Sequence, residues 1–372
     1  MALSKVRLGD YLKLYRECCG IADLTCWDVS GVNKDKEFFE PAKQVGEDTS
    51  NYKIVPPDYF ACNLMHIGRD VVLPIALNCT SKNKYVSPAY TVFCLVNEDL
   101  ILKDYLFMYL NSSEKDRFFW FHCDGSVRDG MDWNVFCDME IEVPPIEVQQ
   151  KYVDIYQGMV NNQKAYERGL EDLKLVRDAM LDKLKKGNVA KKLGDILKCI
   201  DVRNKDLITA TVVGININKE LFPTVADLEN TDLKKYKVLC KNQFAYSPMQ
   251  TGRDESIRVA LYMEDNPVLV SPAYFVLQLM DDEILPEYVM MWFLRAEFDR
   301  YGCFLSDGSV RASLDLNRFF EIEIPVPSSV VQKSIADIFK VYNTRKGINE
   351  RLKAQIKDIC PILIKGSIDE AR

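Results

Sequence analysis

The sequence predicts an α+β protein in which two mixed or mostly β domains follow one another, each succeeded by a long helix. Three observations predict this fold class: an internal repeat along the whole chain, short apolar runs bounded by turn residues, and a heptad-patterned segment after a proline cluster in each half. A length of 372 residues exceeds one ordinary core and is sufficient for two domains. Apolar residues at 48% and charged residues at 28% indicate a globular chain.

The internal repeat consists of six collinear matches between the two halves of the chain, offset by 181 to 185 residues. Six matches in one order with so little drift indicate a tandem duplication. The matched pairs are Leu8-Gly9-Asp10 with Leu193-Gly194-Asp195, Tyr52-Lys53 with Tyr236-Lys237, Gly68-Arg69-Asp70 with Gly252-Arg253-Asp254, Val86 to Tyr90 with Val270 to Tyr274, Asp124 to Arg128 with Asp307 to Arg311, and Glu140 to Pro144 with Glu321 to Pro325.

The first part of each copy has the pattern of short apolar runs and turn residues that is typical of a mixed or mostly β domain. The apolar runs 71–77, 90–96 and 274–279 are short and bounded by turn residues, which favours strands. Turn clusters at 80–83 and 264–267 separate paired apolar runs and predict a hairpin in each copy. Leu, Met, Tyr and Trp at three- and four-residue spacing predict short helices over 103–111 and 286–298.

Prolines end a strand in each copy and introduce the long helix. Apolar residues then recur every seven positions on two seams, which predicts that the two helices pair as an antiparallel coiled coil. The alternative is two separate amphipathic helices, each lying on its own domain, and Pro361 is expected to kink or end the second helix. The predicted segments are 1–145 and 188–327 for the domains, and 146–187 and 328–372 for the helices.

Composition and charge exclude several classes of protein. With 48 Lys+Arg against 55 Asp+Glu the formal net charge is −7, so any DNA-binding surface has to be a local patch. No stretch has the length and apolar character of a signal or membrane segment, so we expect a cytoplasmic protein without membrane contact. The 12 cysteines lack the spacing of zinc knuckles and the chain has only two histidines, so reduced, mostly buried thiols and no metal site are expected.

The chain resembles the specificity subunit of type I restriction-modification systems over its full length: recognition domain, long helix, second recognition domain, long helix. The most specific likeness runs from Gly-Ser-x-Arg through Ile-x-Ile-Pro-x-Pro to a glutamine that opens the helix. In the second copy these are Gly308 to Arg311, Ile322 to Pro327 and Gln332-Lys333; in the first they are Gly125 to Arg128, Ile141 to Pro145 and Gln150-Lys151. A longer gap between these elements in the first copy departs from the pattern and shifts the register by two residues.

The resemblance implies a non-catalytic subunit that reads a bipartite DNA target and directs methyltransferase and restriction subunits to it. Each of two target-recognition domains would read a few base pairs of double-stranded DNA, while the helices separate the domains and dock two adenine methyltransferase subunits. The chain itself would hold no cofactor, since AdoMet and ATP belong to the partner subunits. Restriction subunits are a further partner class, which the sequence leaves open together with the target bases and the spacer length.

The candidate DNA-contacting residues are mostly cations beside small residues, where backbone and a long side chain can both approach a phosphate or base edge. The alternative for each arginine is a tight turn in which it pairs with a neighbouring aspartate (Asp70, Asp124, Asp254 or Asp307). Residues shared by both copies suit phosphates, because two domains that read different bases must differ where they read; the divergent loop 81–84 is therefore a candidate reader, against the alternative of ordinary turn lysines. The candidates are Arg69, Lys82, Lys84, Ser126, Arg128, Arg253, Ser309 and Arg311.

Two other functions remain as alternatives. An adenine methyltransferase is suggested by Ser87-Pro88-Ala89-Tyr90, which superficially resembles the catalytic tetrapeptide of that class. It lacks the second proline and no glycine-rich cofactor loop accompanies it, so a strand-edge element is the simpler interpretation. The acidic pairs Glu140-Glu142 and Glu321-Glu323 alternate beside apolar residues as a solvated strand face does, rather than as nuclease metal ligands. The third class, a scaffold that has lost DNA binding, is consistent with the negative net charge.

Overall fold

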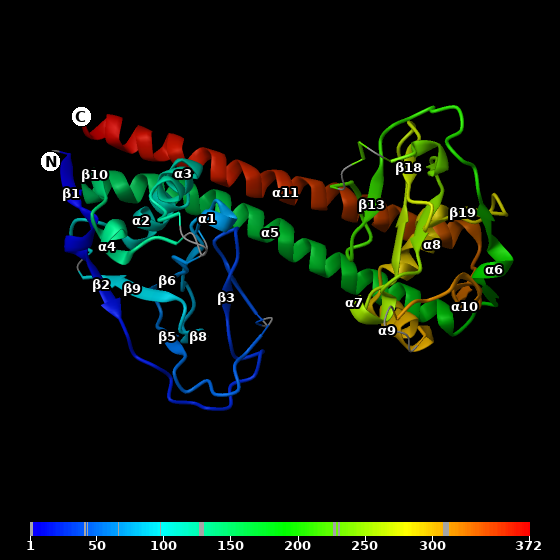
Figure 1. Ribbon diagram of the computed structural model, residues 1–372, viewed down its shortest axis with the longest axis horizontal. Coiled ribbons are helices and arrows are strands. Elements are labelled where there is room, and N and C mark those ends of the chain that lie inside the picture. The colour runs from blue at the N-terminus through cyan, green and yellow to red at the C-terminus, as the bar shows by residue number, and fades with distance from the viewer. Residues whose placement is uncertain are drawn as a thin grey trace. The chain divides into compact units, whose positions relative to one another are not determined.

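A computed structural model describes residues 3–40, 42, 44–65, 67–96, 98–125, 130–225, 228–229, 231–307 and 312–372. The chain forms two compact units, residues 1–165 with 348–372 and residues 166–347. The α+β fold class predicted from the sequence is confirmed: each unit combines antiparallel sheets, short helices and parts of the two long helices α5 (Ile146–Lys185) and α11 (Ser329–Ala371) (Figure 1). Among the described residues, no helix is long and apolar enough to cross a membrane.

The first unit is built on a four-stranded antiparallel sheet in the order β2-β9-β6-β7, with the two-stranded sheets β1-β10, β3-β4 and β5-β8. Its elements are β1 (Ser4–Arg7), the 3-10 turn η1 (Leu8–Tyr11), β2 (Leu12–Tyr15), β3 (Gly31–Val32), β4 (Phe38–Phe39), β5 (Lys53–Val55), β6 (Phe60–Cys62), α1 (Ile67–Asp70), β7 (Ile75–Leu77), β8 (Lys84–Val86), β9 (Thr91–Leu95), α2 (Lys103–Leu110), α3 (Ser113–Phe121), α4 (Trp133–Cys137) and β10 (Glu140–Val143).

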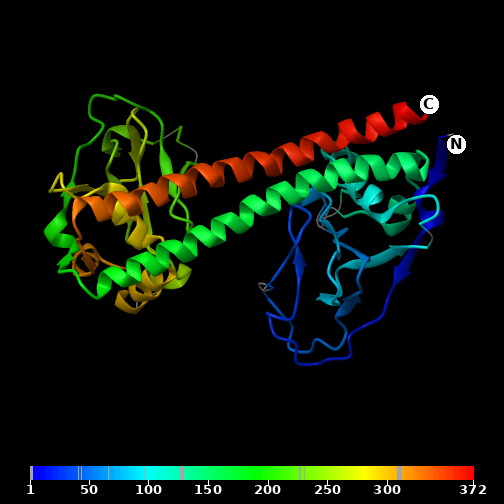
Figure 2. The ribbon, with the colours of Figure 1, turned by 180° about the vertical axis from the view of Figure 1, so that it is seen from behind.

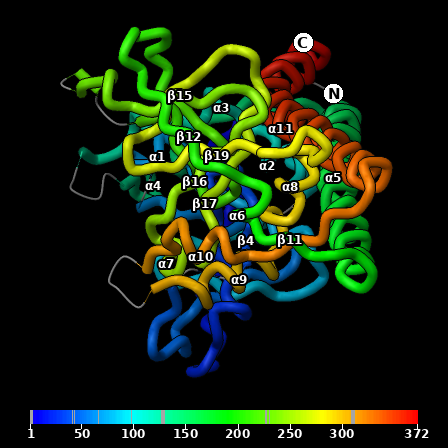
Figure 3. The backbone as a smooth tube through the Cα atoms, turned by 90° about the vertical axis from the view of Figure 1, so that its right-hand side faces the viewer, coloured from blue at the N-terminus to red at the C-terminus, as the bar shows by residue number. Residues whose placement is uncertain are grey.

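The second unit repeats this plan with the strand order β12-β19-β16-β17 (Figure 3) and the pairs β11-β20, β13-β14 and β15-β18. Its elements are β11 (Ala190–Lys192), α6 (Leu193–Ile196), β12 (Leu197–Ile200), β13 (Val213–Ile215), β14 (Leu221–Pro223), η2 (Leu233–Lys235), β15 (Lys237–Leu239), β16 (Phe244–Ser247), α7 (Thr251–Asp254), β17 (Arg258–Leu261), β18 (Val268–Val270), β19 (Phe275–Leu279), α8 (Pro286–Phe293), α9 (Ala296–Leu305), α10 (Leu316–Phe320) and β20 (Glu323–Pro325).

Two local predictions were wrong. The apolar runs on either side of 80–83 do not form a hairpin with each other, because β7 pairs with β6 and β8 pairs with β5; the second unit shows the same exchange. The segment 286–298 is two helices rather than one, since α8 ends before Leu294 and α9 starts at Ala296.

Pro361 does not end α11, which continues to Ala371.

The predicted longer gap in the first copy is also wrong. Strand β1 pairs with β10 so that Arg7 lies opposite Glu140, and β11 pairs with β20 so that Lys192 lies opposite Glu323. Glu140 therefore corresponds to Glu323, not to Glu321, and the offset is 183, as it is in the elements on either side. Matching the two Glu-Ile-Glu segments by identity places them two residues out of register, because residues two apart lie on the same face of a strand.

A buried glutamine ties each strand end to the start of its long helix. Gln149, not Gln150, is the counterpart of Gln332: both are almost fully buried, whereas Gln150 faces solvent. The Gln149 side chain donates from Nε2 to the Pro144 carbonyl at 2.7 Å and accepts at Oε1 from the Leu102 amide at 2.9 Å. Gln332 makes the same two contacts in the second unit.

Within each unit, segments of the two long helices lie side by side and run in opposite directions (Figure 2). In the first unit Lys151 pairs with Glu370 at 2.7 Å, and further along Gln163 donates to Asn349 at 2.8 Å in the interior. In the second unit, Leu181 from α5 and Ile335 and Phe339 from α11 belong to one buried cluster with the domain core. The helices therefore complete each domain's core, which explains why apolar residues occupy more than a single narrow seam.

The two cores fill the same space with different residues. Phe119 stacks on Phe136 in the first unit at 5.4 Å, and Tyr246 stacks on Phe319 in the second at 4.1 Å. Phe136 and Phe319 are equivalent, but the position of Phe119 is held by Gly302 and Ile257 packs against it. A large side chain on a helix has been exchanged for a large side chain on a strand, which preserves the packed volume.

This exchange predicts a different response to alanine at two helical glycines. A Cβ on Gly302 would lie 2.4 Å from Ile257 Cγ1, so Gly302→Ala should lower the free energy of unfolding by about 1–3 kcal/mol. Gly158 in α5 has open space around it, so Gly158→Ala should raise that free energy by about 0.5–1 kcal/mol. Urea unfolding of both variants measures the difference, and equal effects would contradict the core assignment.

Candidate nucleic-acid interface

The Gly-Arg-Asp segments form the short helices α1 and α7, with the arginine directed to solvent and the aspartate to the interior. The side chains of Arg69 and Arg253 are 69% and 68% exposed, while those of Asp70 and Asp254 are 14% and 16% exposed. Arg69 Nε lies 3.1 Å from Asp70 Oδ1, and Arg253 Nε lies 3.8 Å from Asp254 Oδ1. Arg69 thus hydrogen-bonds the aspartate of its own turn, as the alternative interpretation expected, whereas Asp254 is bonded to Arg258 and Arg253 lies farther from it. Both arginine side chains remain largely exposed.

The charge of Asp70 is stabilised in this turn. Burial acts to raise the pKa of the Asp70 carboxyl, but hydrogen bonds and charge from Arg69 and Lys34 outweigh it and lower the pKa. Lys34 Nζ lies 3.4 Å from Asp70 Oδ1. The aspartate is therefore ionised at neutral pH and holds its arginine close to the protein surface.

The two candidate lysines have different surroundings. Lys82 is exposed, and its backbone carbonyl accepts from the Asn78 side chain at 2.9 Å. Lys84 in β8 has a side chain only 17% exposed, and its Nζ lies 2.7 Å from Glu40 Oε1. The hydrogen bond from Lys84, together with one from Ser30, lowers the pKa of Glu40. Lys84 is consequently committed to an internal ion pair, and of the two only Lys82 presents a free cationic end to solvent.

The candidates Ser126, Arg128, Ser309 and Arg311 lie outside the described residues. The described residues that flank them are joined in the same way in both units: the Asp124 amide donates to Gly130 O, and the Asp307 amide donates to Ser313 O, each at 2.9 Å. The flanking positions of the two units are therefore equivalent.

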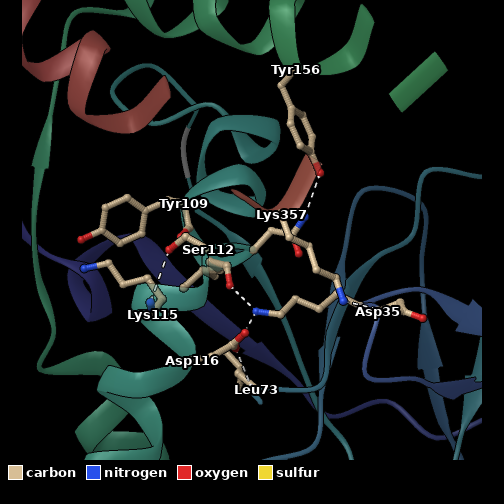
Figure 4. Close-up of polar contacts among 11 residues, drawn as sticks. Asp35, Leu73, Tyr109, Ser112, Lys115, Asp116, Tyr156 and Lys357 are labelled. Carbon is tan, nitrogen blue, oxygen red and sulfur yellow. Dashed lines mark hydrogen bonds and ion pairs between the residues drawn. The ribbon is translucent and has the colours of Figure 1, made fainter. Parts of the chain in front are cut away.

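Each unit contains a buried lysine–aspartate pair that was not predicted from the sequence. Lys36 Nζ lies 2.7 Å from Asp116 Oδ1 with its side chain 1% exposed, and also donates to Leu110 O at 2.6 Å (Figure 4). The same Oδ1 of Asp116 accepts from the Leu73 amide at 3.0 Å. Because Leu73 follows α1 closely, one carboxylate ties α3, the hairpin β3-β4 and the Gly-Arg-Asp turn together (Figure 4).

The second unit repeats the lysine–aspartate pair, although the further acceptor of the lysine is Ser256 Oγ at 3.1 Å in place of a backbone carbonyl. Lys219 Nζ lies 2.7 Å from Asp299 Oδ1 with its side chain 4% exposed, and Asp299 accepts from the Ile257 amide at 2.9 Å. In the first unit, burial lowers the pKa of Lys36 in spite of the nearby Asp116 charge. A desolvated lysine of this kind depends on its partner, since an unpaired charge in the interior is costly.

The sequence did contain a signal for this pair. Gly31-Val32-Asn33 to Lys36-Glu37 returns at an offset of 183 as Gly214-Ile215-Asn216 to Lys219-Glu220. Lys36 and Lys219 both adopt positive φ, 61° and 64°, in a turn closed by the preceding asparagine side chain. The identities are interrupted by unlike residues, so the match is visible only once the repeat is followed through the hairpin.

The Ser-Pro-Ala-Tyr segments have a structural role in the described chain. Each forms a turn in which the tyrosine amide donates to the serine carbonyl, and a lysine from the neighbouring strand donates to the tyrosine carbonyl. Lys53 makes this contact to Tyr90 at 2.5 Å, and Lys237 makes it to Tyr274 at 2.6 Å. Both tetrapeptides therefore close strand edges, as the simpler interpretation predicted.

The residues in the described ranges form no cluster of potential metal ligands. No group of three or more His, Cys, Asp or Glu side chains in those ranges is placed to hold an ion. A cavity of about 370 Å³ in the first unit borders the β3-β4 turn and includes Lys36, Lys84 and Lys357. These three lysines are paired with Asp116, Glu40 and Asp35 respectively, and Lys164 and Lys353 also line the cavity.

Comparison with known proteins agrees with the resemblance seen in the sequence. Residues 223–358 match the family model of the type I restriction modification DNA specificity domain. No curated protein matches the chain. The fold is similar to that of the type I restriction-modification S subunit from M. genitalium, at 13% identity and a TM-score of 0.52, covering 98% of this chain and 96% of that one.

Two further solved structures are similar at lower scores. One is the HsdS subunit from Thermoanaerobacter tengcongensis, at 11% identity and a TM-score of 0.36, covering 99% of this chain and 96% of that one. The other comes from work on complex assembly and conformational transition of the type I R-M system, at 11% identity and a TM-score of 0.44, covering 100% and 97%.

The buried pair predicts a large and specific loss of stability. Asp116→Ala leaves Lys36 without its partner and the Leu73 amide without its acceptor, so the free energy of unfolding should fall by about 3–5 kcal/mol. The double variant Lys36→Met with Asp116→Asn removes both charges and keeps an acceptor, and should recover most of that loss. Urea unfolding compares the two, and equal losses would contradict a role for the charge pair.

Proposed function

We propose that the protein is the specificity subunit of a type I restriction-modification system and reads a bipartite site in double-stranded DNA, one half with each unit. The observation that carries this proposal is the duplication of one structural plan. The family model matches residues 223–358, most of which lie in the second unit, and the first unit repeats the strand order, the buried lysine–aspartate pair and the Gly-Arg-Asp turn of that unit. Two copies of one reader in a single chain suit a target in two parts.

Each unit would hold the DNA backbone with shared residues and read bases with divergent ones. Arg69 and Arg253 are exposed, equivalent and suited to phosphate oxygens. The repeated segments 124–128 and 307–311 are also proposed to contact phosphates, through Ser126, Arg128, Ser309 and Arg311. Lys82 belongs to a loop that differs between the units and is proposed as a base or edge contact in the first half-site. Lys84 is not included, because it is paired with Glu40.

The long helices are proposed to pair as an antiparallel coiled coil that spaces the units and docks two adenine methyltransferase subunits. A helix of 40 residues such as α5 spans roughly 60 Å. Half-sites about 10 base pairs apart would place both readers on one face of the DNA. Catalysis, AdoMet and ATP would then belong to the partners, which include restriction subunits, and the complex would act in the cytoplasm.

Two measurements separate this proposal from its alternatives. Binding of AdoMet by the isolated chain would favour a methyltransferase, whose supposed tetrapeptide is here a strand-edge turn. Absence of salt-dependent binding to duplex DNA would favour a scaffold without DNA affinity.

Domain exchange tests the bipartite target. Replacing residues 1–145 with the corresponding residues of a relative should change one half of the methylated sequence and leave the other half intact. Methylome sequencing of cells that co-express the methyltransferase measures both halves. A continuous target, or a change in both halves, would contradict one reader per unit.

Phosphate contacts predict a change in salt dependence. Arg69→Ala and Arg253→Ala should each weaken binding to all duplexes and reduce the slope of log K against log salt by about one. Arg168→Ala, on the exposed face of α5, is the matched control and should leave the slope unchanged. Fluorescence anisotropy across a salt series measures the slopes; a loss confined to one sequence would instead assign base reading to that arginine.

A further inference from the structure

The helix that precedes each Asp-Gly-Ser-Val-Arg segment carries the same exposed pair of side chains in both units. Arg117 and Phe121 lie on α3, and Arg300 and Phe304 occupy the equivalent positions on α9. Both phenylalanines are 82% exposed, and both arginines are exposed. A spacing of four residues places arginine and phenylalanine on one face of the helix.

This pair is shared while its surroundings differ. Between the arginine and the phenylalanine, Phe119 and Trp120 of the first unit correspond to Gly302 and Cys303 of the second. An exposed phenylalanine forgoes most of the stabilisation that burial would provide. Phenylalanine is exposed at this position in both units although the neighbouring positions 115, 119 and 120 differ from 298, 302 and 303, which indicates a contact that both units make with another molecule.

The pair borders the surface that carries the Gly-Arg-Asp arginines. In the second unit Cys303 Sγ lies 3.5 Å from the Thr251 carbonyl of α7. A Cβ on Gly252 would lie 3.4 Å from Ser306 Cβ, two residues beyond Phe304. Helices α1 and α3 are likewise in contact in the first unit. Arg253 and Phe304 thus belong to adjoining helices of one unit, as do Arg69 and Phe121.

The charge of this surface is not neutralised from within. Neither Arg117 nor Arg300 forms an ion pair or hydrogen bond with a residue in the described ranges. The aspartates that precede them, Asp116 and Asp299, point inward to Lys36 and Lys219. The exposed face therefore offers a cation beside an aromatic ring. Glu114 and Glu297 lie three residues before the arginines, and Glu297 is paired with Lys185 at 2.6 Å.

We propose that the pairs Arg117–Phe121 and Arg300–Phe304 contact the backbone of duplex DNA, the arginine at a phosphate and the phenylalanine against the neighbouring sugar. This inference rests on the proposed function and assigns a contact surface within it. The DNA backbone presents anionic oxygens next to apolar sugar edges, which is the combination that this surface complements, and a backbone contact can be shared by two units that read different bases. The interior lysine–aspartate pair positions the surface, since its carboxylate holds the first turn of each helix.

The test first requires a DNA probe that the full-length chain binds, and this probe is obtained by selection. The full-length chain is used to enrich binding sequences from a pool of random duplexes, and the enriched duplex becomes the probe for anisotropy titrations. Phe121→Ala and Phe304→Ala should each reduce affinity for the enriched duplex and for unrelated duplexes about tenfold, without changing the salt slope, because the lost contact is apolar and independent of sequence. Arg117→Ala and Arg300→Ala should each lower the salt slope by about one.

Matched variants keep the result interpretable. Val176→Ala removes an exposed apolar side chain from α5 and should bind as the parent chain does. Phe121→Leu should retain most of the affinity, since it keeps an apolar contact. All variants should show the parent's unfolding midpoint, because the substituted side chains are exposed.

The outcomes separate this inference from the proposed function. If the parent chain enriches no sequence and binds duplex without salt dependence, the proposed function itself is wrong. If the parent binds and the phenylalanine variants bind equally well, the inference is overturned. It is also overturned if those variants keep DNA affinity but no longer co-purify with the methyltransferase, because the surface would then be a protein dock.

Discussion

The rest of each domain depends on one buried ion pair. Lys36–Asp116 and Lys219–Asp299 join a β-hairpin, a helix and the segment after the Gly-Arg-Asp turn through a single carboxylate. A charge pair in the interior is directional, and losing either partner is penalised, so it holds these elements in one arrangement where apolar packing alone would tolerate small slides. The elements that it fixes are those that carry the exposed arginines.

This arrangement also reconciles the proposed DNA surface with a net charge of −7 for the chain. The aspartates nearest the exposed arginines are turned inward or paired, as Asp116, Asp254 and Asp299 show. Other cations, such as Lys84 and Lys357, form ion pairs with Glu40 and Asp35. The sign of the surface is therefore set by which charges are neutralised locally, and net charge says little about it.

The buried lysine–aspartate pair is the same in both units, whereas several residues of the apolar core differ. Phe119 in the first unit and Tyr246 in the second provide the same stacking partner from different elements, and Gly302 is small because Ile257 occupies the space. A core accepts such exchanges when its total volume is kept, whereas a hydrogen-bonded charge pair accepts no equivalent exchange. The two units could thus diverge in packing and in exposed loops while presenting their shared cations in the same way.

The sequence by itself determined the duplication, the α+β class, the proline-terminated strands and the long helices, because these depend on periodicity and local backbone chemistry. The tertiary structure alone decided strand partners and register. The runs beside 80–83 pair with other strands. Glu140 corresponds to Glu323, which the sequence could not decide because a glutamate two residues away lies on the same face of the strand and matches equally well. It also decided which cations are free. Lys84 and Arg69 look alike in sequence, but only folding brings Glu40 to the first and leaves the second largely exposed, because such partners are distant in the chain.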